Sequence, residues 1–225
     1  MTLAQPFTTT SPVIRSVSFT ELITNLGFIE LYAGQTTDLK LLTSFTYPSN
    51  KVAESAVSMS AGSSPGSVRF NHDYDILINK TIVLQGTAVV TIPIKVTNAA
   101  AGGNSANGFP IVSLIKDDGS ETVIVTNPGL ADTVESDATD RGWGADIAYG
   151  SPTVDLVIPN NTILKAGETL RLTVEVHGWS VQGAGTITYA HDPANRTQDW
   201  DESSVWDSTG QTMTSQIKLL LPTKI

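Results

Sequence analysis

The stretch GETLRLTVEVHGW, residues 167–179, limits what this chain can fold into more than any other part of the sequence. Apolar residues occupy every second position, and polar or charged residues lie between them. The apolar set is Leu170, Leu172, Val174 and Val176, and the polar set is Arg171, Thr173, Glu175 and His177. Strict alternation with a period of two is typical of an antiparallel strand with one buried face. We therefore predict a strand at or near the centre of a sheet, with the apolar set in the core.

A second alternating stretch, VVTIPIKVTN at 89–98, predicts another strand. Its inward residues would be Val90, Ile92, Ile94 and Val96. Pro93 falls on the outward face of this strand. Because proline cannot donate a hydrogen bond to a sheet, Pro93 predicts an edge strand or a bulge.

The stretch PIVSLIKDDGSETVIV, residues 110–125, predicts a β-hairpin. Two apolar runs flank Asp117, Asp118 and Gly119, and an Asp-Gly pair readily adopts the positive φ of a tight turn. Further strands are expected at 27–34, 38–45, 153–159, 185–190 and 215–222. Residues 18–27 favour one short helix, with Ser18 and Glu21 as its capping box and Gly27 as its end.

Many short strands, with Gly, Pro and Asn between them, predict an all-β fold. The expected architecture is an antiparallel β-sandwich of jelly-roll type with long loops and at most one short helix. Residues 1–12 would form an extended N-terminal arm, and residues 13–225 a single domain. The long connections are 47–73, 98–108, 131–151 and 191–211. Connections of this length in a compact domain usually carry function, which favours a scaffold that presents surfaces to partners.

Composition excludes several classes of function. The chain has no cysteine, which excludes disulfides, thiolate zinc sites and a cysteine nucleophile. Its formal net charge of −9 disfavours direct binding to nucleic acid. The first 20 residues do not read as a signal peptide, and no apolar run has the length of about 20 residues that spans a membrane. We therefore expect synthesis and assembly in a cytoplasm.

The stretch YAHDPANRTQDW, residues 189–200, resembles an active site in composition. His191 would need a nucleophile within reach to act as a general base, and no G-x-S-x-G elbow is present. Asp before proline commonly opens a turn. We therefore predict that His191, Asp192 and Arg196 structure a loop, with Asp192 and Arg196 paired across the turn, and that His191 is not catalytic.

Metal binding has little support in the sequence. The three histidines, His72, His177 and His191, lack the short spacing that places two imidazoles on one ion. His177, on the polar face of its strand beside Glu175, is expected to be solvated or at an interface. The acidic stretches 71–75 and 199–207 offer oxygen ligands, so structural calcium is the alternative to a solvated loop. No other cofactor is expected.

The four tryptophans, Trp143, Trp179, Trp200 and Trp206, lie in loops or just after a strand. Exposed tryptophans on a β-sandwich can stack on sugar rings, and tryptophan also anchors protein–protein interfaces. The alternative is that they cover the ends of the core. They are the candidate interface or ligand-binding residues of this chain.

Three stretches resemble virion structural proteins of tailed viruses of bacteria and archaea. These are FTELITNLGFIELYAGQ, KAGETLRLTVEVHGW, and HDPANR together with the terminal IKLLLPTKI. The resemblance implies a non-enzymatic jelly-roll subunit of capsid-associated or decoration type, located in the virion and assembled in the host cytoplasm. It implies contacts with other capsid proteins and a homo-oligomer, for which a trimer is the leading expectation. A carbohydrate-binding module that uses the tryptophans is the alternative function.

Overall fold

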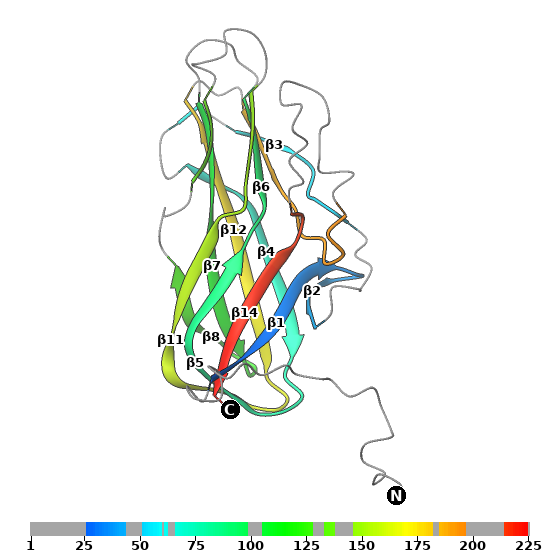
Figure 1. Ribbon diagram of the computed structural model, residues 1–225, viewed down its shortest axis with the longest axis vertical. Coiled ribbons are helices and arrows are strands. Elements are labelled where there is room, and N and C mark those ends of the chain that lie inside the picture. The colour runs from blue at the N-terminus through cyan, green and yellow to red at the C-terminus, as the bar shows by residue number, and fades with distance from the viewer. Residues whose placement is uncertain are drawn as a thin grey trace, which may run out of the picture.

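The computed structural model describes residues 26–43, 51–59, 61–62, 66–98, 105–127, 133–137, 146–181, 185–196 and 214–224. These residues form an all-β structure of fourteen strands (Figure 1). The strands are β1 (Leu26–Gln35), β2 (Leu39–Leu42), β3 (Val57–Met59), β4 (Ser67–Leu77), β5 (Ile82–Thr91), β6 (Ile94–Asn98), β7 (Ser105–Asp117), β8 (Glu121–Asn127), β9 (Val134–Asp137), β10 (Asp146–Gly150), β11 (Thr153–Leu164), β12 (Thr169–Ser180), β13 (Gly185–Tyr189) and β14 (Ile217–Lys224).

The strands belong to two sheets. The large sheet has ten strands in the order β11-β5-β14-β1-β2-β4-β12-β7-β8, with β9 paired to the far end of β7. The small sheet has the order β10-β6-β13-β3. Neighbouring strands are antiparallel, apart from a short parallel contact between β2 and β4. The end strands β11 and β8 of the large sheet contact each other, so this sheet curls towards a barrel around its core.

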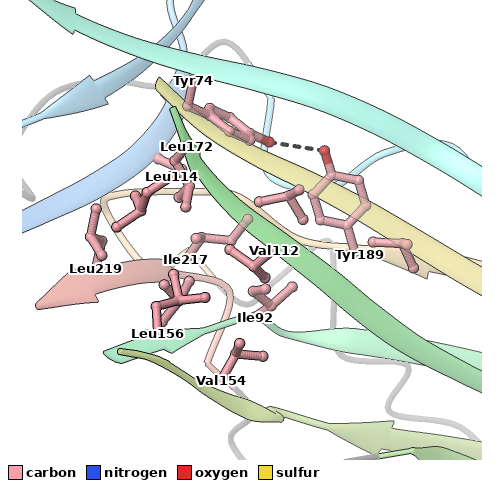
Figure 2. Packing of buried hydrophobic residues seen from close by; sticks show 14 of the residues in the cluster. Tyr74, Ile92, Val112, Leu114, Val154, Leu156, Leu172, Tyr189, Ile217 and Leu219 are labelled. Atoms are coloured by element: carbon pink, nitrogen blue, oxygen red, sulfur yellow. Dashed lines mark hydrogen bonds between the residues drawn. The ribbon is translucent and has the colours of Figure 1, made fainter. Parts of the chain in front are cut away.

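The strand predicted from residues 167–179 is β12, and it lies inside the large sheet between β4 and β7. Its apolar set is fully buried: Leu170, Leu172, Val174 and Val176 are all 0% exposed. They pack in an aliphatic core with residues from β5, β7, β11 and β14 (Figure 2). The predictions of alternation and of a central position are both confirmed.

Residues 89–98 form parts of two strands, so the prediction of one continuous strand is wrong. Val90, Ile92, Ile94 and Val96 are 0% exposed, as predicted. Pro93, expected on the outward face, is instead buried between β5 of the large sheet and β6 of the small one. Proline ends the ladder of β5 because it has no N–H to donate. The chain crosses here from one sheet to the other, and the carbonyl of Pro93 accepts a hydrogen bond from the amide of Ala190 (3.1 Å).

The predicted hairpin is present as β7 and β8. Asp117 pairs with Glu121 across the turn, and Gly119 has a φ of +103°. The Asp117 side chain accepts a hydrogen bond from the Gly119 amide at 2.9 Å, which closes the turn. The residues of the turn itself therefore determine this hairpin.

The predicted helix is contradicted at its end, because Leu26 and Gly27 begin β1. The remainder of that prediction, residues 18–25, lies outside the described residues. The described ranges contain no helix, and so none that is long and apolar enough to cross a membrane. Three of the expected loops also contain strands. The strand β3 and the start of β4 lie within 47–73, the start of β7 lies within 98–108, and β9 and β10 lie within 131–151. These strand segments contain few apolar residues, so the alternation of apolar and polar side chains is too weak to predict a strand.

The small sheet packs against one end of β7 and β12 at very short range. A Cβ added to Gly108 would lie 2.5 Å from Cδ1 of Ile187, and one added to Gly178 would lie 2.8 Å from Sδ of Met59. Ile187 and Met59 belong to β13 and β3 of the small sheet. Glycine at these two positions therefore allows the two sheets to approach each other.

Candidate functional site

His191 follows β13 and is 0% exposed, so it lies inside the protein and not on an open loop. The backbone fixes it there. The amide of His191 donates to the carbonyl of Val52 (2.9 Å), and the amide of Asp192 donates to the carbonyl of Ser215 (2.8 Å). Three segments that are distant in sequence meet at this point.

Glu54 is the partner of His191. His191 Nε2 donates to Glu54 Oε1 at 3.0 Å, and Lys51 Nζ lies 2.7 Å from Glu54 Oε2. The amide of Glu54 also donates to the carbonyl of Tyr189 (2.9 Å). The hydrogen bond from His191, supported by that from Lys51, outweighs the desolvation of the carboxylate and lowers the pKa of Glu54 to about 2.

Two tyrosines and a second histidine continue this network. The hydroxyls of Tyr74 and Tyr189 are hydrogen-bonded at 2.9 Å (Figure 2), and the Tyr189 hydroxyl is also bonded to His72 Nδ1. His72 Nδ1 lies 4.0 Å from Glu54 Oε1. Burial raises the pKa of both tyrosines and lowers the pKa of His72. We call Glu54, His72, Tyr74, Tyr189 and His191 the junction cluster.

The junction cluster joins the two sheets. His72 and Tyr74 belong to β4 of the large sheet, Tyr189 belongs to β13 of the small sheet, and Glu54 lies on the segment before β3. The five members of the cluster therefore connect three parts of the chain: β4, the end of β13 and the segment before β3. Hydrogen bonds between buried polar groups are directional, so they fix how these parts are oriented.

The chemistry open to the junction cluster is limited by burial. A histidine paired with a carboxylate can act as a general base only where a substrate reaches its ring. His191 and both tyrosines are 0% exposed, and His191 Nδ1 is buried without a hydrogen-bond partner. Among the described residues, no group of three or more acidic or histidine side chains has a geometry that could hold a metal ion.

Asp192 organises the turn that follows His191, and the pair expected with Arg196 is present. Asp192 is 0% exposed, and its carboxylate accepts from the Arg196 amide (2.7 Å), Nε (2.9 Å) and Nη2 (3.1 Å). Asn195 adopts a φ of +52°, and its side-chain oxygen accepts from the Ser215 amide at 2.7 Å. The turn is therefore tied to the segment that enters β14.

Of the four tryptophans, Trp179 lies within the described residues. Trp179 lies on β12 and is half-buried, with its ring edge-on to Phe109 at 5.9 Å. His177 also stacks on Phe109, with ring centroids 5.1 Å apart, and its side chain is only 12% exposed. His177 was expected to be solvated or at an interface. Solvation is wrong, because its ring stacks on Phe109 and is largely covered, and the interface stays a prediction. Trp143, Trp200 and Trp206 lie outside the described residues.

The acidic stretch 71–75, considered for calcium, is part of β4. Asp75 forms a two-point ion pair with Arg171 at 2.7 and 3.0 Å, and Asp73 accepts a hydrogen bond from Thr173 at 2.6 Å. These carboxylates therefore form cross-strand pairs between β4 and β12. The second stretch, 199–207, lies outside the described residues.

No pattern in the sequence indicates the partner of His191. Glu54 lies 137 positions from His191, in a stretch predicted to be a loop. For His72 and Tyr74 the sequence contains one indication of their position. They alternate with Asp73 and Asp75 in the stretch NHDYD. That alternation places them on the inward face of a strand.

Comparison with known proteins identifies no family. No protein-family model matches the chain, and no curated protein matches it. Among solved structures, a CocE/NonD family hydrolase from Staphylococcus aureus gives a TM-score of 0.44 at 12% identity, over 88% of this chain and 37% of that one. An aminopeptidase from a marine sediment archaeon, Thaumarchaeota archaeon, gives 0.48 at 8% identity, over 90% and 37%. An α-amino acid ester hydrolase gives 0.47 at 10% identity, over 87% and 36%. This chain spans a little over a third of the length of those proteins.

Proposed function

We propose that this chain is a non-enzymatic structural protein of a virion, a capsid-associated or decoration subunit that multimerises and binds a capsid lattice. The observation that carries the proposal is the burial of His191. The histidine that looks most like a catalytic residue is 0% exposed, and its Nε2 is engaged by Glu54. This geometry supports a role in holding two sheets together rather than in chemistry on a substrate.

The architecture supports the same proposal. The described strands are almost all antiparallel, and the chain crosses between sheets at Pro93. We take the fold to be a β-sandwich of jelly-roll type, as the resemblance to virion proteins implies. Such a scaffold is rigid and can present loops and sheet faces to neighbouring subunits.

The proposed partners are further copies of this chain, with a trimer as the leading arrangement, and other capsid proteins. The arm at residues 1–12, outside the described residues, is the proposed contact with a neighbour. The alternative of a carbohydrate-binding module depends on exposed tryptophans. Trp179 gives it no support, because its ring packs against Phe109.

Light scattering over a wide range of concentrations tests the proposal, together with electron microscopy of virus particles labelled by an antibody against this chain. The expected result is a multimer in solution and label on the particle surface. Ester, peptide and glycan substrates should show no turnover. Turnover that is lost in His191→Ala, with the melting curve unchanged, would contradict the proposal. So would a protein that is monomeric throughout and absent from particles.

A further inference from the structure

The junction cluster contains a chain of hydrogen bonds that has a direction. The hydroxyls of Tyr74 and Tyr189 are bonded to each other (Figure 2), and the Tyr189 hydroxyl is also bonded to Nδ1 of His72. When Nδ1 is unprotonated, it accepts from Tyr189, and the Tyr189 oxygen accepts from Tyr74. In this arrangement both buried hydroxyls donate a hydrogen bond, and neither hydroxyl proton is left without an acceptor.

Protonation of His72 reverses this chain. An imidazolium donates from both ring nitrogens, so Nδ1 would donate to the Tyr189 oxygen, and the Tyr189 hydroxyl would donate to Tyr74. Among the described residues Tyr189 is the hydrogen-bond partner of Tyr74, so the Tyr74 proton then lacks an acceptor, although Tyr74 is 0% exposed. A buried donor without a partner destabilises the arrangement that buries it.

Residues 51–59, which we call the strap, form the edge of the small sheet beside this chain of hydrogen bonds. Within the strap, β3 pairs with β13 at three positions. Before β3, the Glu54 amide donates to the Tyr189 carbonyl, and the Val52 carbonyl accepts from the His191 amide, both at 2.9 Å. Among the described residues, no strand pairs with the other edge of β3. An edge held by so few backbone bonds is a part of a fold that can open locally.

Glu54 attaches the strap to both histidines. Its Oε1 lies 3.0 Å from His191 Nε2 and 4.0 Å from His72 Nδ1. The side chain of His72 is 26% exposed, and burial of its ring outweighs the attraction of Glu54 and lowers the pKa of His72. On β12 the uncharged Val174 lies opposite His72. The groups around His72 that can carry charge are Glu54 and Lys51 in the strap, Tyr189 and His191 at the end of β13, and Asp73 and Tyr74 on β4 itself.

We infer that the strap is an acid-operated latch: protonation of His72 releases residues 51–59 from β13 while the large sheet stays folded. Release gives the imidazolium and the tyrosine hydroxyls access to water, so the open state binds the proton more tightly than the closed state. That difference in proton affinity shifts the equilibrium towards the open state as the pH falls. The latch does not depend on the proposed function.

Opening of the latch changes what the surface presents. The strap covers one edge of β13, and its Val52 and Met59 side chains are at most 9% exposed while it is closed. Release therefore exposes these side chains together with the unpaired backbone groups of β13. An open sheet edge is a template on which another chain can pair.

Amide hydrogen exchange, followed by NMR between about pH 7.5 and 5.5, tests the latch. The amides of Glu54 and His191 report on the strap, because each is bonded between the strap and the end of β13. The amide of Leu172, in the central strand β12, reports on unfolding of the whole protein. After correction for intrinsic rates, the two strap amides should be less protected than Leu172. Their protection should fall by at most about tenfold for each pH unit below 6.5. Dilute urea should leave the strap amides unchanged, because local opening exposes little surface.

Two matched substitutions identify the trigger. His72→Gln keeps a polar side chain that does not titrate, so the protection of the strap amides should no longer depend on pH. His177→Gln makes the same change on the outer face of β12 and should retain the response of the unaltered protein. Circular dichroism and melting verify folding. If His72→Gln does not fold, NMR titration of the His72 ring in the unaltered protein replaces it, and the ring should titrate over the pH range in which the strap opens.

Strap amides that are as protected as Leu172 at every pH would show that the strap does not open by itself. Protection that does not change with pH, or a response that persists in His72→Gln, would show that His72 is not the trigger. Each of these results overturns the inference.

Discussion

The aliphatic core and the junction cluster are both buried, but different forces hold them. In the core, side chains such as Leu114, Leu156, Leu172 and Leu219 fill the space inside the curled large sheet (Figure 2). Their attraction is non-directional and depends on the apolar area that leaves water. In the junction cluster, each member contacts specific polar atoms of a residue far away in sequence. The core therefore determines that the sheet closes, and the cluster determines how the small sheet and the segment around Glu54 are placed on it.

This difference predicts different responses to perturbation. A core residue can be exchanged for another apolar residue of similar volume at small cost. Removing one partner of a buried polar pair lowers stability more than such an exchange does, because the other partner stays desolvated and unpaired. The aliphatic side chains of the core do not titrate, whereas the cluster contains a carboxylate, two histidines and two tyrosines, which also border the core.

The largest effect is expected in the core. Leu172→Ala should lower the free energy of unfolding by about 2 to 5 kcal/mol, because Leu172 is fully buried and a cavity would remain. The neighbouring Arg171→Ala is the matched control on the outer face of the same strand, and it should lower the free energy of unfolding by less, because it leaves no cavity in the core. Urea unfolding of both variants measures the difference. Equal losses would show that the outer face of β12 is as deeply covered as its inner face.

An intermediate effect is expected next to the cluster. Asp192→Ala removes the acceptor for the Arg196 amide and guanidinium, and hydrogen bonds to a charged group each contribute about 1.5 to 3 kcal/mol. We expect a loss of stability in that range in thermal or urea unfolding. Asp192→Asn keeps one acceptor oxygen and should lose less. If both variants were as stable as the unaltered protein, the turn would not depend on Asp192.

The smallest effect is the pH dependence of the cluster. Burial lowers the folded-state pKa of His72 below its usual value of 6.5, so the unfolded chain binds more protons and stability falls as the pH drops below about 6.5. Glu54, whose pKa is lowered to about 2, contributes stability above pH 4.5 that is lost as the pH falls from there towards 2. Urea midpoints measured from pH 8 to pH 3 should show both phases.

Two variants assign these phases. His72→Gln should flatten the phase below about pH 6.5, and Glu54→Gln should flatten the phase below pH 4.5. Leu172→Ala lowers stability at every pH and should leave the shape of the profile unchanged. A His72→Gln profile identical to that of the unaltered protein would show that another group is responsible for the upper phase.

The sequence by itself determined the features that depend on neighbouring residues. Alternation at 167–179 predicted both the strand and its buried face, because side chains of an extended backbone point to opposite sides in turn. The Asp-Gly pair at 118–119 predicted the hairpin, since glycine supplies the positive φ that the turn requires. Asp192 and Arg196 are four residues apart, so their pairing also followed from local geometry.

Only the tertiary structure decided how distant segments meet. The contact between Glu54 and His191 depends on the packing of β13 against the large sheet, and no short-range pattern encodes a separation of 137 residues. Pro93 showed in the sequence that a ladder is interrupted, but not that the chain changes sheets there. The outward-facing side chains of β1, β14, β5 and β11 likewise become neighbours only through the register between these strands, which come from four separate parts of the chain. The alternation within a strand determines which of its side chains are buried. Which strand pairs with it depends on how much apolar surface the whole fold buries and how many backbone groups it pairs, and no single segment contains that information.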